Sequence, residues 1–555
     1  MNKDPVILHG PELLYEPGRG GLGFELYRSL QLHKDKIGRY IIETGESCTH
    51  GDIFVRSKKL AIYLKSKNLK KDDVVCLCSQ NQIHSTVPFF AAKFIDVGYA
   101  SIEPTMAEED LVYLFEYIKP KVLFVAENVE EKIGECLVKS NIQAEVIIIG
   151  NCENKLSLEK IVSQTVDEEF TPVIIENLKE TAVLFFSSGT TGKPKGICCN
   201  HYSLLSKIIN IGDQILDTGS FNLSNFTLTL SEDSYSNTLT YSPMYWISGI
   251  SLVIMATLHG SILTIGATFD SETLWGALKK YKPTVVFLPP GQVTDIYLKW
   301  KENSYEVNDN LKLFVTGGGP VRPYHLDYME QMFPKAYNFQ MLGLTEATGL
   351  ITLFSVKDPK SKVLQKKYPE SCGQVAAGIS IKIVDVDTEE LCGYNQQGEL
   401  RINTKLIMNG YYKMDSSSCF DQDGWFKTGD LAYINEEDCL VIVDRLKDIL
   451  LYTVYNIRTS VIEDILAQHP SVHECCVIGI PHPEDNEHPM GVVKLKNGFN
   501  GKTTSEEILD FFNQRVPSDR YKIRAGVKLV NEIVKTPTGK IKKVAMKKLI
   551  LENQL

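Results

Sequence analysis

The residues that most clearly suggest chemistry form one loop rich in glycine, hydroxyl and lysine side chains, Ser187-Ser188-Gly189-Thr190-Thr191-Gly192-Lys193-Pro194-Lys195-Gly196. Glycines let the backbone turn tightly and expose its N–H groups, while the hydroxyls and lysines add hydrogen-bond donors and positive charge. Such a loop can wrap a polyphosphate. It is not a Walker P-loop, because Pro194 follows Lys193 where that motif requires serine or threonine. A flexible surface hairpin is the alternative interpretation of a cluster of this kind.

Two apolar runs flank this loop. Residues 182–186 are predicted to form a buried strand, and residues 197–199 a second, shorter one. In this order and directly after a core strand, the ten residues match the signature of the adenylate-forming superfamily. Acyl-CoA synthetases, 4-coumarate:CoA ligases, beetle luciferases and peptide-synthetase adenylation domains belong to it. The resemblance implies an ATP site in which the loop closes over the β- and γ-phosphates.

Further segments resemble the same superfamily, at residues 316–320, 340–346, 423–430, 441–448 and 535–541. The resemblance implies that Thr345 meets the phosphate region and that Glu346 reaches Mg²⁺. One glutamate is enough for such a site, because Mg²⁺ commonly takes one carboxylate together with substrate phosphates and waters. It also implies nucleotide contacts along adenine from Gly318, Gly319, Leu342 and Gly343.

Two other segments would complete the nucleotide site. By resemblance, Asp430 accepts both ribose hydroxyls with its carboxylate, and Arg445 also reaches the ribose. Lys540 stands where the superfamily keeps the lysine that serves its first reaction step, and Lys447 stands where a small C-terminal domain pivots. The lysines that follow are expected to form a solvated helix face: Lys542, Lys543, Lys547 and Lys548.

The substrate pocket is expected around Tyr245, Trp246 and Ile247, which align with the segment that lines the acyl pocket of the superfamily. Luciferases and coumarate ligases tend to place histidine where Tyr245 or Trp246 stands. Plain core packing is the alternative interpretation, because aromatic residues beside a proline are usually buried. Apolar pockets recognise apolar substrates, so these residues favour a fatty acid over a hydroxycinnamate, whose phenol would need a buried partner.

Three positions depart from the superfamily pattern. Leu342 replaces the aromatic residue that packs on adenine, which leaves an apolar contact without stacking. After the hinge, Leu451 replaces a lysine and Val454 replaces a glycine, in a loop that faces the active site during thioester formation. Valine adds a side chain where the pantetheine thiol must pass. Light emission is not expected, because the pocket histidine and the post-hinge lysine are both missing.

The resemblance as a whole implies an acyl-CoA synthetase that uses ATP, Mg²⁺ and coenzyme A. It would activate a small-molecule carboxylic acid, expected to be a fatty acid, as acyl-AMP and then form acyl-CoA. One alternative is an enzyme that makes acyl-adenylates but transfers them poorly. Another is a non-catalytic relative that binds nucleotide or acyl ligand, although Glu346, Asp430 and Lys540 are all retained.

Strand-like and helix-like segments alternate in the elements that must position these residues. Residues 74–78, 122–125 and 146–149 are predicted strands, and a helix capped at Thr49 would have Val55, Leu60, Ile62 and Leu64 on its apolar side. This alternation indicates a layered α/β architecture with parallel sheets. The resemblance implies a large, multi-subdomain N-terminal domain of layered sheets and helices at 1–444. A small, mobile C-terminal α+β domain would follow at 445–555, with its hinge near Lys447.

Length and composition limit the remaining possibilities. A chain of 555 residues is too long for one core. Its 43% hydrophobic and 23% charged residues are typical of a soluble globular protein, and the net charge of −10 disfavours a nucleic-acid partner. The 13 cysteines show no Cys-x-x-Cys spacing, which favours small buried hydrophobic side chains in a reducing compartment over disulfides or zinc.

No targeting or membrane segment is apparent. The first residues lack the apolar core of a signal peptide, and the apolar stretch 247–258 is short for a membrane span. The terminal Asn553-Gln554-Leu555 does not match the Ser-Lys-Leu peroxisomal signal. A cytoplasmic location is therefore expected, with a peroxisomal one possible by family.

Overall fold

The computed structural model describes most of the chain, namely residues 4–166, 168–188, 193–215, 220–222, 227–229, 237–307, 309–535, 541–552 and 554. For Ser188 and for residues 211–215, 220–222 and 227–229 it describes the backbone alone. The structure divides into two compact units. One comprises Leu8–Ile381 and Ile402–Phe426, here called the large unit; the other comprises Met1–Ile7, Lys382–Arg401 and Lys427–Leu555, here called the small unit.

A six-stranded sheet forms the first layer of the large unit, in the order β7-β6-β4-β5-β8-β9. All neighbouring strands are parallel except β8 and β9, which form an antiparallel hairpin around the glycine-rich loop. The parallel strands β4 and β6 are buried at every residue, which explains why they read as continuous apolar runs. The strands are β4 (Val74–Cys78), β5 (Gly98–Ile102), β6 (Val122–Ala126), β7 (Glu145–Ile149), β8 (Thr181–Ser188) and β9 (Pro194–Asn200).

A nine-stranded sheet forms the second layer, in the order β18-β17-β16-β15-β14-β12-β13-β2-β3. It is parallel from β2 to β16 and antiparallel at both ends, where β3 pairs with β2 and β17 with β16. Its strands are β2 (Ile37–Ile41), β3 (Ser47–Thr49), β12 (Asn237–Thr240), β13 (Ile262–Ile265), β14 (Val285–Leu288), β15 (Leu313–Gly317), β16 (Tyr337–Leu344), β17 (Gly349–Leu353) and β18 (Gln374–Val375). A separate two-stranded ribbon joins β10 (Ser220–Asn222) and β11 (Thr227–Thr229).

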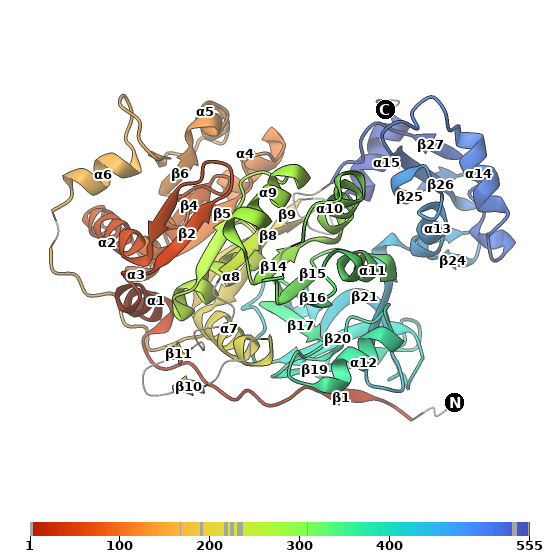
Figure 1. The fold of residues 1–555 in the computed structure, drawn as a ribbon, viewed down its shortest axis with the longest axis horizontal. Coiled ribbons are helices and arrows are strands. Elements are labelled where there is room, and N and C mark those ends of the chain that lie inside the picture. The colour runs from red at the N-terminus through yellow and green to blue at the C-terminus, as the bar shows by residue number, and fades with distance from the viewer. Residues whose placement is uncertain are drawn as a thin grey trace. The chain divides into compact units, whose positions relative to one another are not determined.

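Helices connect and cover these strands, and α10 and α11 pack against each other beside β15 and β16 (Figure 1). The helix α2 begins where the sequence predicts, because Thr49 and Asp52 form a reciprocal capping box. The helices of the large unit are α1 (Gly21–Leu32), α2 (His50–Ser66), α3 (Val87–Phe94), α4 (Glu108–Ile118), α5 (Glu130–Lys139), α6 (Leu158–Gln164), α7 (His201–Ile215), α8 (Ile247–His259), α9 (Ser271–Tyr281), α10 (Pro290–Asn303), α11 (Pro323–Met332) and α12 (Pro359–Lys367).

The C-terminal part of the small unit is an α+β fold built on a sheet of order β24-β23-β26-β25, with β27 paired to β26. A second sheet has the order β1-β19-β20-β21-β22. The boundaries between the two units along the sequence fall within its strands β1, β19, β20 and β21. The strands are β1 (Ile7–His9), β19 (Ile379–Val384), β20 (Gly398–Thr404), β21 (Phe426–Ile434), β22 (Leu440–Arg445), β23 (Leu450–Tyr452), β24 (Tyr455–Ile457), β25 (Val472–His482), β26 (Asn486–Leu495) and β27 (Val527–Leu529). The helices are α13 (Thr459–Leu466), α14 (Ser505–Asn513) and α15 (Lys543–Leu551).

The layered α/β fold class expected from the sequence is confirmed by these sheets and helices. Two details of the helix predictions are wrong. Val55, placed on the apolar side of α2, is 41% exposed, whereas Leu60 and Leu64 are fully buried. On the last helix, Lys543 and Lys547 are not simply solvated, because they form ion pairs with Glu463 and Glu487 at 2.8 and 2.9 Å. The boundary at 444/445 stays a prediction.

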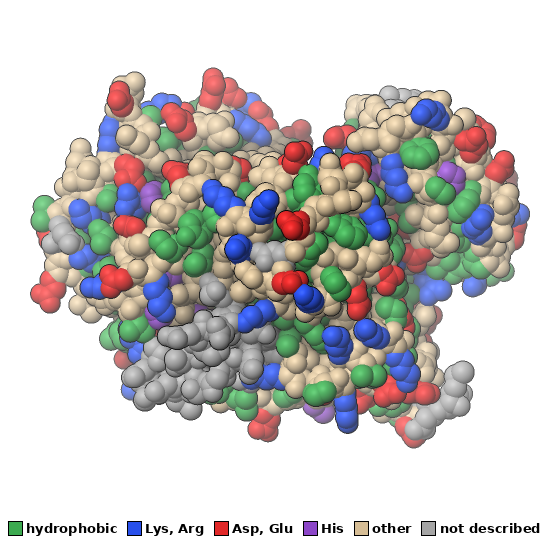
Figure 2. Space-filling view, in the orientation of Figure 1, with side chains coloured by type: hydrophobic (Ala, Val, Ile, Leu, Met, Phe, Trp, Pro, Cys, Tyr) green, Lys and Arg blue, Asp and Glu red, His purple; other side chains and the backbone are tan. Residues whose placement is uncertain are grey.

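Cysteine and membrane predictions can also be compared with the structure. All 13 cysteines are free, and most are buried, including the adjacent Cys198 and Cys199. Burial raises the pKa of the Cys199 thiol to about 12, so this thiol is inert at neutral pH. Within the described ranges, none of the helices combines the length and the apolar character needed to span a membrane. On the face drawn in Figure 2, acidic and basic side chains are interspersed.

Candidate active site

The hairpin of β8 and β9 positions the two ends of the glycine-rich loop. Ser187 lies opposite Lys195 and Ser188 opposite Pro194 in the antiparallel ladder. The ammonium of Lys193 lies 4.7 Å from the centre of the Tyr113 ring on α4. The four residues between, Gly189, Thr190, Thr191 and Gly192, lie outside the described residues. The strands on either side therefore hold the loop's ends together at one edge of the six-stranded sheet.

A carboxylate from a distant part of the chain lies near this hairpin. The Tyr411 hydroxyl donates a hydrogen bond of 3.1 Å to Oε1 of Glu346. The ammonium of Lys195 lies 5.3 Å from the centre of the same Tyr411 ring, within the range of a cation–π interaction. One tyrosine thus contacts both the second lysine of the loop and the glutamate expected to reach Mg²⁺.

Backbone pairing along β9 explains why Tyr411 lies there. The Cys198 N–H donates to the Gly410 carbonyl at 3.1 Å, and the Tyr412 N–H donates to the Gly196 carbonyl at 2.7 Å. The Met408 N–H also donates to the Glu346 carbonyl at 2.8 Å. The segment 408–412 therefore crosses from the turn after β16 to β9. Burial, and then the Glu346 carboxylate, raise the pKa of the Tyr411 hydroxyl, which remains a donor at neutral pH.

The turn after β16 carries Thr345 and Glu346, both half-buried. The Thr345 carbonyl lies 3.6 Å from Sγ of Cys199 on β9, and the Thr348 N–H donates to the same carbonyl at 2.9 Å. Thr348 takes a left-handed backbone conformation with φ of 56°, which is uncommon for a β-branched residue. The turn is thus held by its own backbone and by β9.

The glycines expected to contact the nucleotide differ in what the fold requires of them. Gly318, directly after β15, has φ of +81°, and a Cβ atom added there would meet nothing within 4 Å. Beside it, a Cβ on Gly319 would meet only Pro290, at 3.6 Å. A Cβ on Gly343, in contrast, would lie 2.9 Å from the Gly349 carbonyl oxygen, so the β16–β17 pairing itself requires glycine there. Leu342, at the bulge between these strands, is half-buried.

The small unit brings Asp430 and Arg445 together. They are directly opposite each other on the antiparallel strands β21 and β22, and Nε of Arg445 lies 2.7 Å from Oδ1 of Asp430. The Asp430 side chain is 3% exposed and that of Arg445 is 38% exposed. Arg445 also donates to the Thr428 carbonyl at 3.3 Å. Lys447 is exposed in a short 3₁₀ turn, Leu446–Asp448, that follows β22 directly.

The predicted pocket residues lie at the start of α8. Trp246 is the residue before the helix and Ile247 its first residue; both are half-buried, as is Tyr245. The rings of Tyr245 and Trp246 meet edge to face, with centroids 6.2 Å apart. Burial, and then the nearby Glu103 carboxylate, raise the pKa of the Tyr245 hydroxyl. Half-burial of three large apolar side chains at one helix end is compatible with a pocket wall and with core packing.

The post-hinge loop is the turn between β23 and β24. Tyr452 pairs with Tyr455, which leaves Thr453 and Val454 as a two-residue turn. Val454 is 83% exposed and Leu451 is 44% exposed. Thr453, not Val454, has the positive φ, at 50°. The backbone of this turn therefore makes no demand for glycine at 454.

The sequence matches the AMP-binding enzyme family over residues 28–412 and the AMP-binding enzyme C-terminal domain over residues 461–540. The chain belongs to the AMP-binding enzyme family. Among its relatives, a luciferin 4-monooxygenase of Photuris pensylvanica is 26% identical over 99% of this chain and 98% of its own. A probable CoA ligase of Humulus lupulus is 29% identical over 92% of this chain and 90% of its own.

Solved structures that resemble this AMP-binding enzyme include a luciferase-like enzyme and a CoA synthetase. A luciferase-like enzyme from the nonluminescent mealworm Zophobas morio is 29% identical, with a TM-score of 0.71, over 80% of this chain and all of that one. The o-succinylbenzoate CoA synthetase of Bacillus subtilis, solved with an acyl-adenylate intermediate, is 20% identical and has a TM-score of 0.78 over 96% of this chain and 99% of that one. At 20% identity, the similarity to this synthetase shows a shared fold alone.

The structure brings together some of the predicted residues of this AMP-binding enzyme. Lys195 and Glu346 are brought together around Tyr411, and Asp430 is brought to Arg445. Lys540 lies outside the described residues. Tyr411 is the residue that sequence reasoning missed: the run Gly410-Tyr411-Tyr412 is visible in the sequence, but its pairing with β9 is not.

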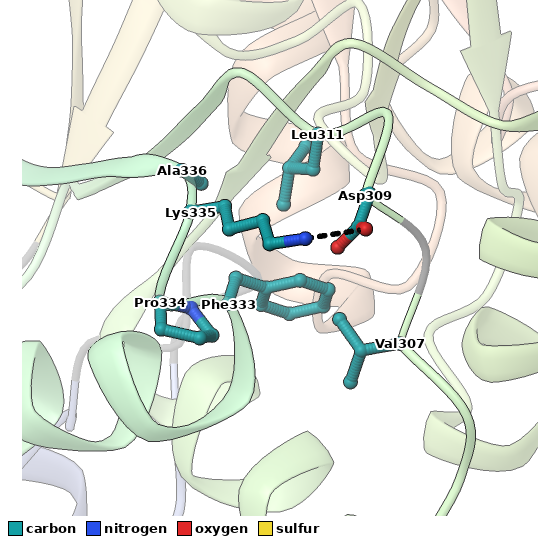
Figure 3. Close-up of a pocket in the computed structure, with 7 residues that line it drawn as sticks. All are labelled: Val307, Asp309, Leu311, Phe333, Pro334, Lys335 and Ala336. Carbon is teal, nitrogen blue, oxygen red and sulfur yellow. Dashed lines mark hydrogen bonds and ion pairs between the residues drawn. The ribbon is translucent and has the colours of Figure 1, made fainter.

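A small hollow elsewhere in the large unit does not belong to this site (Figure 3). It has room for about one water molecule and is lined by Val307, Asp309, Leu311, Phe333, Pro334, Lys335 and Ala336. Lys335 and Asp309 form an exposed ion pair of 2.6 Å across it. None of the predicted pocket residues contributes to its wall, and it is too small for an acyl chain.

Proposed function

We propose that this AMP-binding enzyme is an ATP-dependent acyl-CoA synthetase. In the first step, a carboxylate oxygen of the substrate attacks the α-phosphorus of ATP, which forms acyl-AMP and expels pyrophosphate. In the second step, the thiol of coenzyme A attacks the acyl carbonyl and AMP leaves. Two anions approach each other in the first step, so the barrier is mainly electrostatic and positional.

The observation that carries this proposal is the contact of Tyr411 with both Glu346 and Lys195. It holds a carboxylate near the second lysine of the glycine-rich loop, although Glu346 comes 151 residues after Lys195 (346 − 195). A half-buried carboxylate beside a phosphate-binding hairpin fits the needs of Mg²⁺, which prefers one or two carboxylates plus phosphate oxygens. Bound there, Mg²⁺ would neutralise charge on the phosphates. Glu346 would hold the ion, and Lys195 would add positive charge at the loop.

Other nucleotide contacts are proposed for residues of each unit by itself. Asp430, held by Arg445, would accept the ribose hydroxyls. Gly318 and Gly319 would lie along adenine, because both have space for a flat ligand above their backbone. The names of some related structures agree: one o-succinylbenzoate CoA synthetase was solved in complex with ATP and magnesium ion.

An enzyme that forms acyl-AMP but transfers it slowly is the second candidate. Val454 and Leu451 favour it, because they stand where the superfamily has glycine and lysine. The exposure of Val454 places its side chain on the turn's outer surface, where an approaching thiol would meet it. A non-catalytic binder is a weaker candidate, since Asp430 and Glu346 keep partners that hold them in place.

Pyrophosphate release measures the first step directly. The purified full chain would be incubated with ATP, Mg²⁺ and a panel of carboxylic acids, with and without coenzyme A. We expect acid-dependent pyrophosphate release that falls more than about 100-fold in Glu346→Gln, the scale for removing a preorganised charged group. Glu116→Gln, which changes an exposed glutamate on α4 that has no proposed role, is the control. Nucleotide binding without acid-dependent pyrophosphate release would instead support the non-catalytic binder.

The same panel tests the acid. Tyr245, Trp246 and Ile247 would make one pocket wall apolar, so medium- and long-chain fatty acids should be preferred to hydroxycinnamates. Faster turnover of coumarate than of every saturated fatty acid would contradict this preference. The cytoplasmic location also stays a prediction, which a fluorescent fusion would test; one relative is a peroxisomal OPC-8:0-CoA ligase of Arabidopsis thaliana.

A further inference from the structure

Two histidines and an aspartate meet at the hairpin between β25 and β26, in the small unit. Their ligand atoms, one from each of His482, Asp485 and His488, all lie within 4.8 Å of one another. Nε2 of His488 lies 2.8 Å from Oδ2 of Asp485, and Nδ1 of His482 lies 3.6 Å from the same oxygen. The three side chains are between 18% and 34% exposed, so an ion from solvent can reach them.

These separations suit a tetrahedral ion. Zn²⁺ binds imidazole nitrogen and carboxylate oxygen at about 2.0–2.2 Å, which puts neighbouring ligand atoms about 3.3 Å apart. The two observed separations, 2.8 and 3.6 Å, lie on either side of that value. Imidazole with carboxylate is a donor set that suits zinc-like transition ions better than Mg²⁺ or Ca²⁺, which prefer oxygen ligands alone.

Nδ1 of His482 and Nε2 of His488 have hydrogen-bonding partners that an ion would replace. The backbone N–H groups of Glu484 and Asp485 donate to Nδ1 of His482, at 3.4 and 3.2 Å, so an ion bound at this nitrogen would displace these two hydrogen bonds. The His488 ring stacks on the His482 ring, with centroids 3.9 Å apart and planes inclined by 16°. An ion bound there would replace the direct contact between Nε2 of His488 and Oδ2 of Asp485.

The cluster is also tied to the post-hinge turn. The Thr453 N–H donates to the Asp485 carbonyl at 2.8 Å, and the Asn486 side-chain amide donates to the Thr453 carbonyl at 2.9 Å. A ligand residue and its neighbour thus hold both backbone groups of Thr453. An ion bound by Asp485 would fix the segment on which this turn rests.

We propose that His482, Asp485 and His488 form a binding site for one divalent transition-metal ion of the zinc type. Solvent supplies the fourth ligand, as at other zinc sites with three protein ligands. The site is separate from the acyl-CoA synthetase reaction proposed above, and its occupancy does not depend on that reaction. When it is filled, the Thr453 turn is held more firmly.

Zinc binding by the metal-stripped full chain tests the proposal. Zn²⁺ would be titrated in competition with a chromophoric chelator, in the absence of ATP and acid. We expect one equivalent of Zn²⁺ whose affinity falls more than about 10-fold in His488→Ala and in Asp485→Asn, since even supporting residues of metal sites contribute 10–100-fold. Glu484→Gln is the matched control, because Glu484 lies in the same hairpin but outside the cluster. Zinc bound by cysteine side chains would be the same in wild type and in every variant, so the difference between them reports the proposed site.

Two outcomes would overturn the proposal. The first is an equal number and affinity of Zn²⁺ sites in wild type, His488→Ala and Asp485→Asn. The second is unchanged hydrogen exchange at the Thr453 amide when zinc is bound, because its acceptor belongs to a ligand residue. Thermal unfolding without metal shows whether each variant is folded, and Asp485→Asn keeps the shape of the side chain if His488→Ala does not fold. Zinc should raise the unfolding midpoint of wild type and of Glu484→Gln only.

Discussion

At the scale of single residues, Glu346 depends on a tyrosine from another part of the chain. The Tyr411 hydroxyl donates to the Glu346 carboxylate at 3.1 Å. A hydrogen bond to a charged group contributes about 1.5–3 kcal/mol net. A carboxylate held by such a bond needs less reordering when it takes up an ion, which links Tyr411 to the proposed Mg²⁺ site.

The first prediction is that Tyr411→Phe raises the Mg²⁺ concentration needed for half-maximal pyrophosphate release, by about 3- to 10-fold. The physical reason is the lost hydroxyl, since the ring that faces Lys195 is kept. Initial rates at a series of Mg²⁺ concentrations give this value. Tyr412→Phe removes the neighbouring hydroxyl and should leave the half-maximal Mg²⁺ concentration unchanged. An equal shift of this concentration in both variants would mean that Tyr411 acts through packing.

The second prediction concerns Lys540, which lies outside the described residues and whose role rests on resemblance. Lys540→Ala should slow acyl-AMP formation by about 2–4 kcal/mol of transition-state stabilisation, the scale for removing a preorganised donor. ATP affinity should change far less, because the loop and Asp430 remain. Single-turnover formation of acyl-AMP, with ATP binding measured separately, checks both parts. Wild-type rates of adenylate formation in the variant would exclude the role.

At the scale of elements, the turn between β23 and β24 is the segment to which we assign an effect on the proposed second half-reaction. Its backbone is held by the β25–β26 hairpin through Thr453, while the Val454 side chain has no comparable role and is 83% exposed. A change at Val454 therefore alters the surface of the turn and leaves its pairing intact. Replacement of an exposed side chain typically changes stability by no more than about 0.5 kcal/mol, with up to 1 kcal/mol more for glycine.

The third prediction is that Val454→Gly speeds thioester formation and leaves adenylation nearly unchanged. Wild type should release a burst of pyrophosphate and then form acyl-CoA slowly, if the valine side chain obstructs the thiol. Acyl-AMP would be formed first and coenzyme A added afterwards, in a single turnover. Leu451→Lys alone should do less, because a restored charge cannot act while the path stays narrow. Equal thioester rates in wild type and Val454→Gly would show that valine is tolerated.

At the scale of the whole molecule, buried histidines make stability depend on pH. His33, His50 and His259 lie close together in the large unit, and the rings of His33 and His50 are 6.1 Å apart. Burial, and then the positive charge of Arg39, lower the pKa of His50 to about 3. Burial, and then His33, lower the pKa of His259 to about 4. These side chains are neutral in the folded protein at neutral pH.

The fourth prediction follows from the sign of these shifts. A histidine has a pKa near 6.5 when unfolded, so between that value and the folded pKa the unfolded chain binds more protons. The contribution of these neutral histidines to the free energy of unfolding is therefore fully present above pH 6.5 and is lost as the pH drops towards 4. For His259, which is 5% exposed, the loss is up to about 3 kcal/mol. Denaturant unfolding at a series of pH values across this range gives the slope of the free energy of unfolding against pH.

His259→Leu provides the comparison, because it removes one titrating group from this cluster. The variant's free energy of unfolding should fall less steeply with decreasing pH than that of wild type, whatever its absolute stability. Parallel curves for the two proteins would mean that His259 does not remain neutral in the folded state.

Local sequence determined much of this protein by itself. The strands β4 and β6 were predictable because central parallel strands are buried on both faces and so read as continuous apolar runs. The start of α2 was predictable because a capping box is complete within four residues. The motif around Ser187 identified the family for the same reason: a phosphate loop is built from consecutive backbone groups and needs no distant partner.

Only the tertiary structure decided how distant segments meet. The contact of Tyr411 with Glu346 and Lys195 depends on backbone pairing between β9 and residues 408–412, and backbone atoms leave no signal in the side-chain pattern. Lys543 looked like part of a solvated face because its partner, Glu463, comes from another helix. His482, Asp485 and His488 are near in sequence, but the hairpin's register determines that their ligand atoms converge. Such contacts are set by which surfaces the fold buries together, and that is a property of the whole chain.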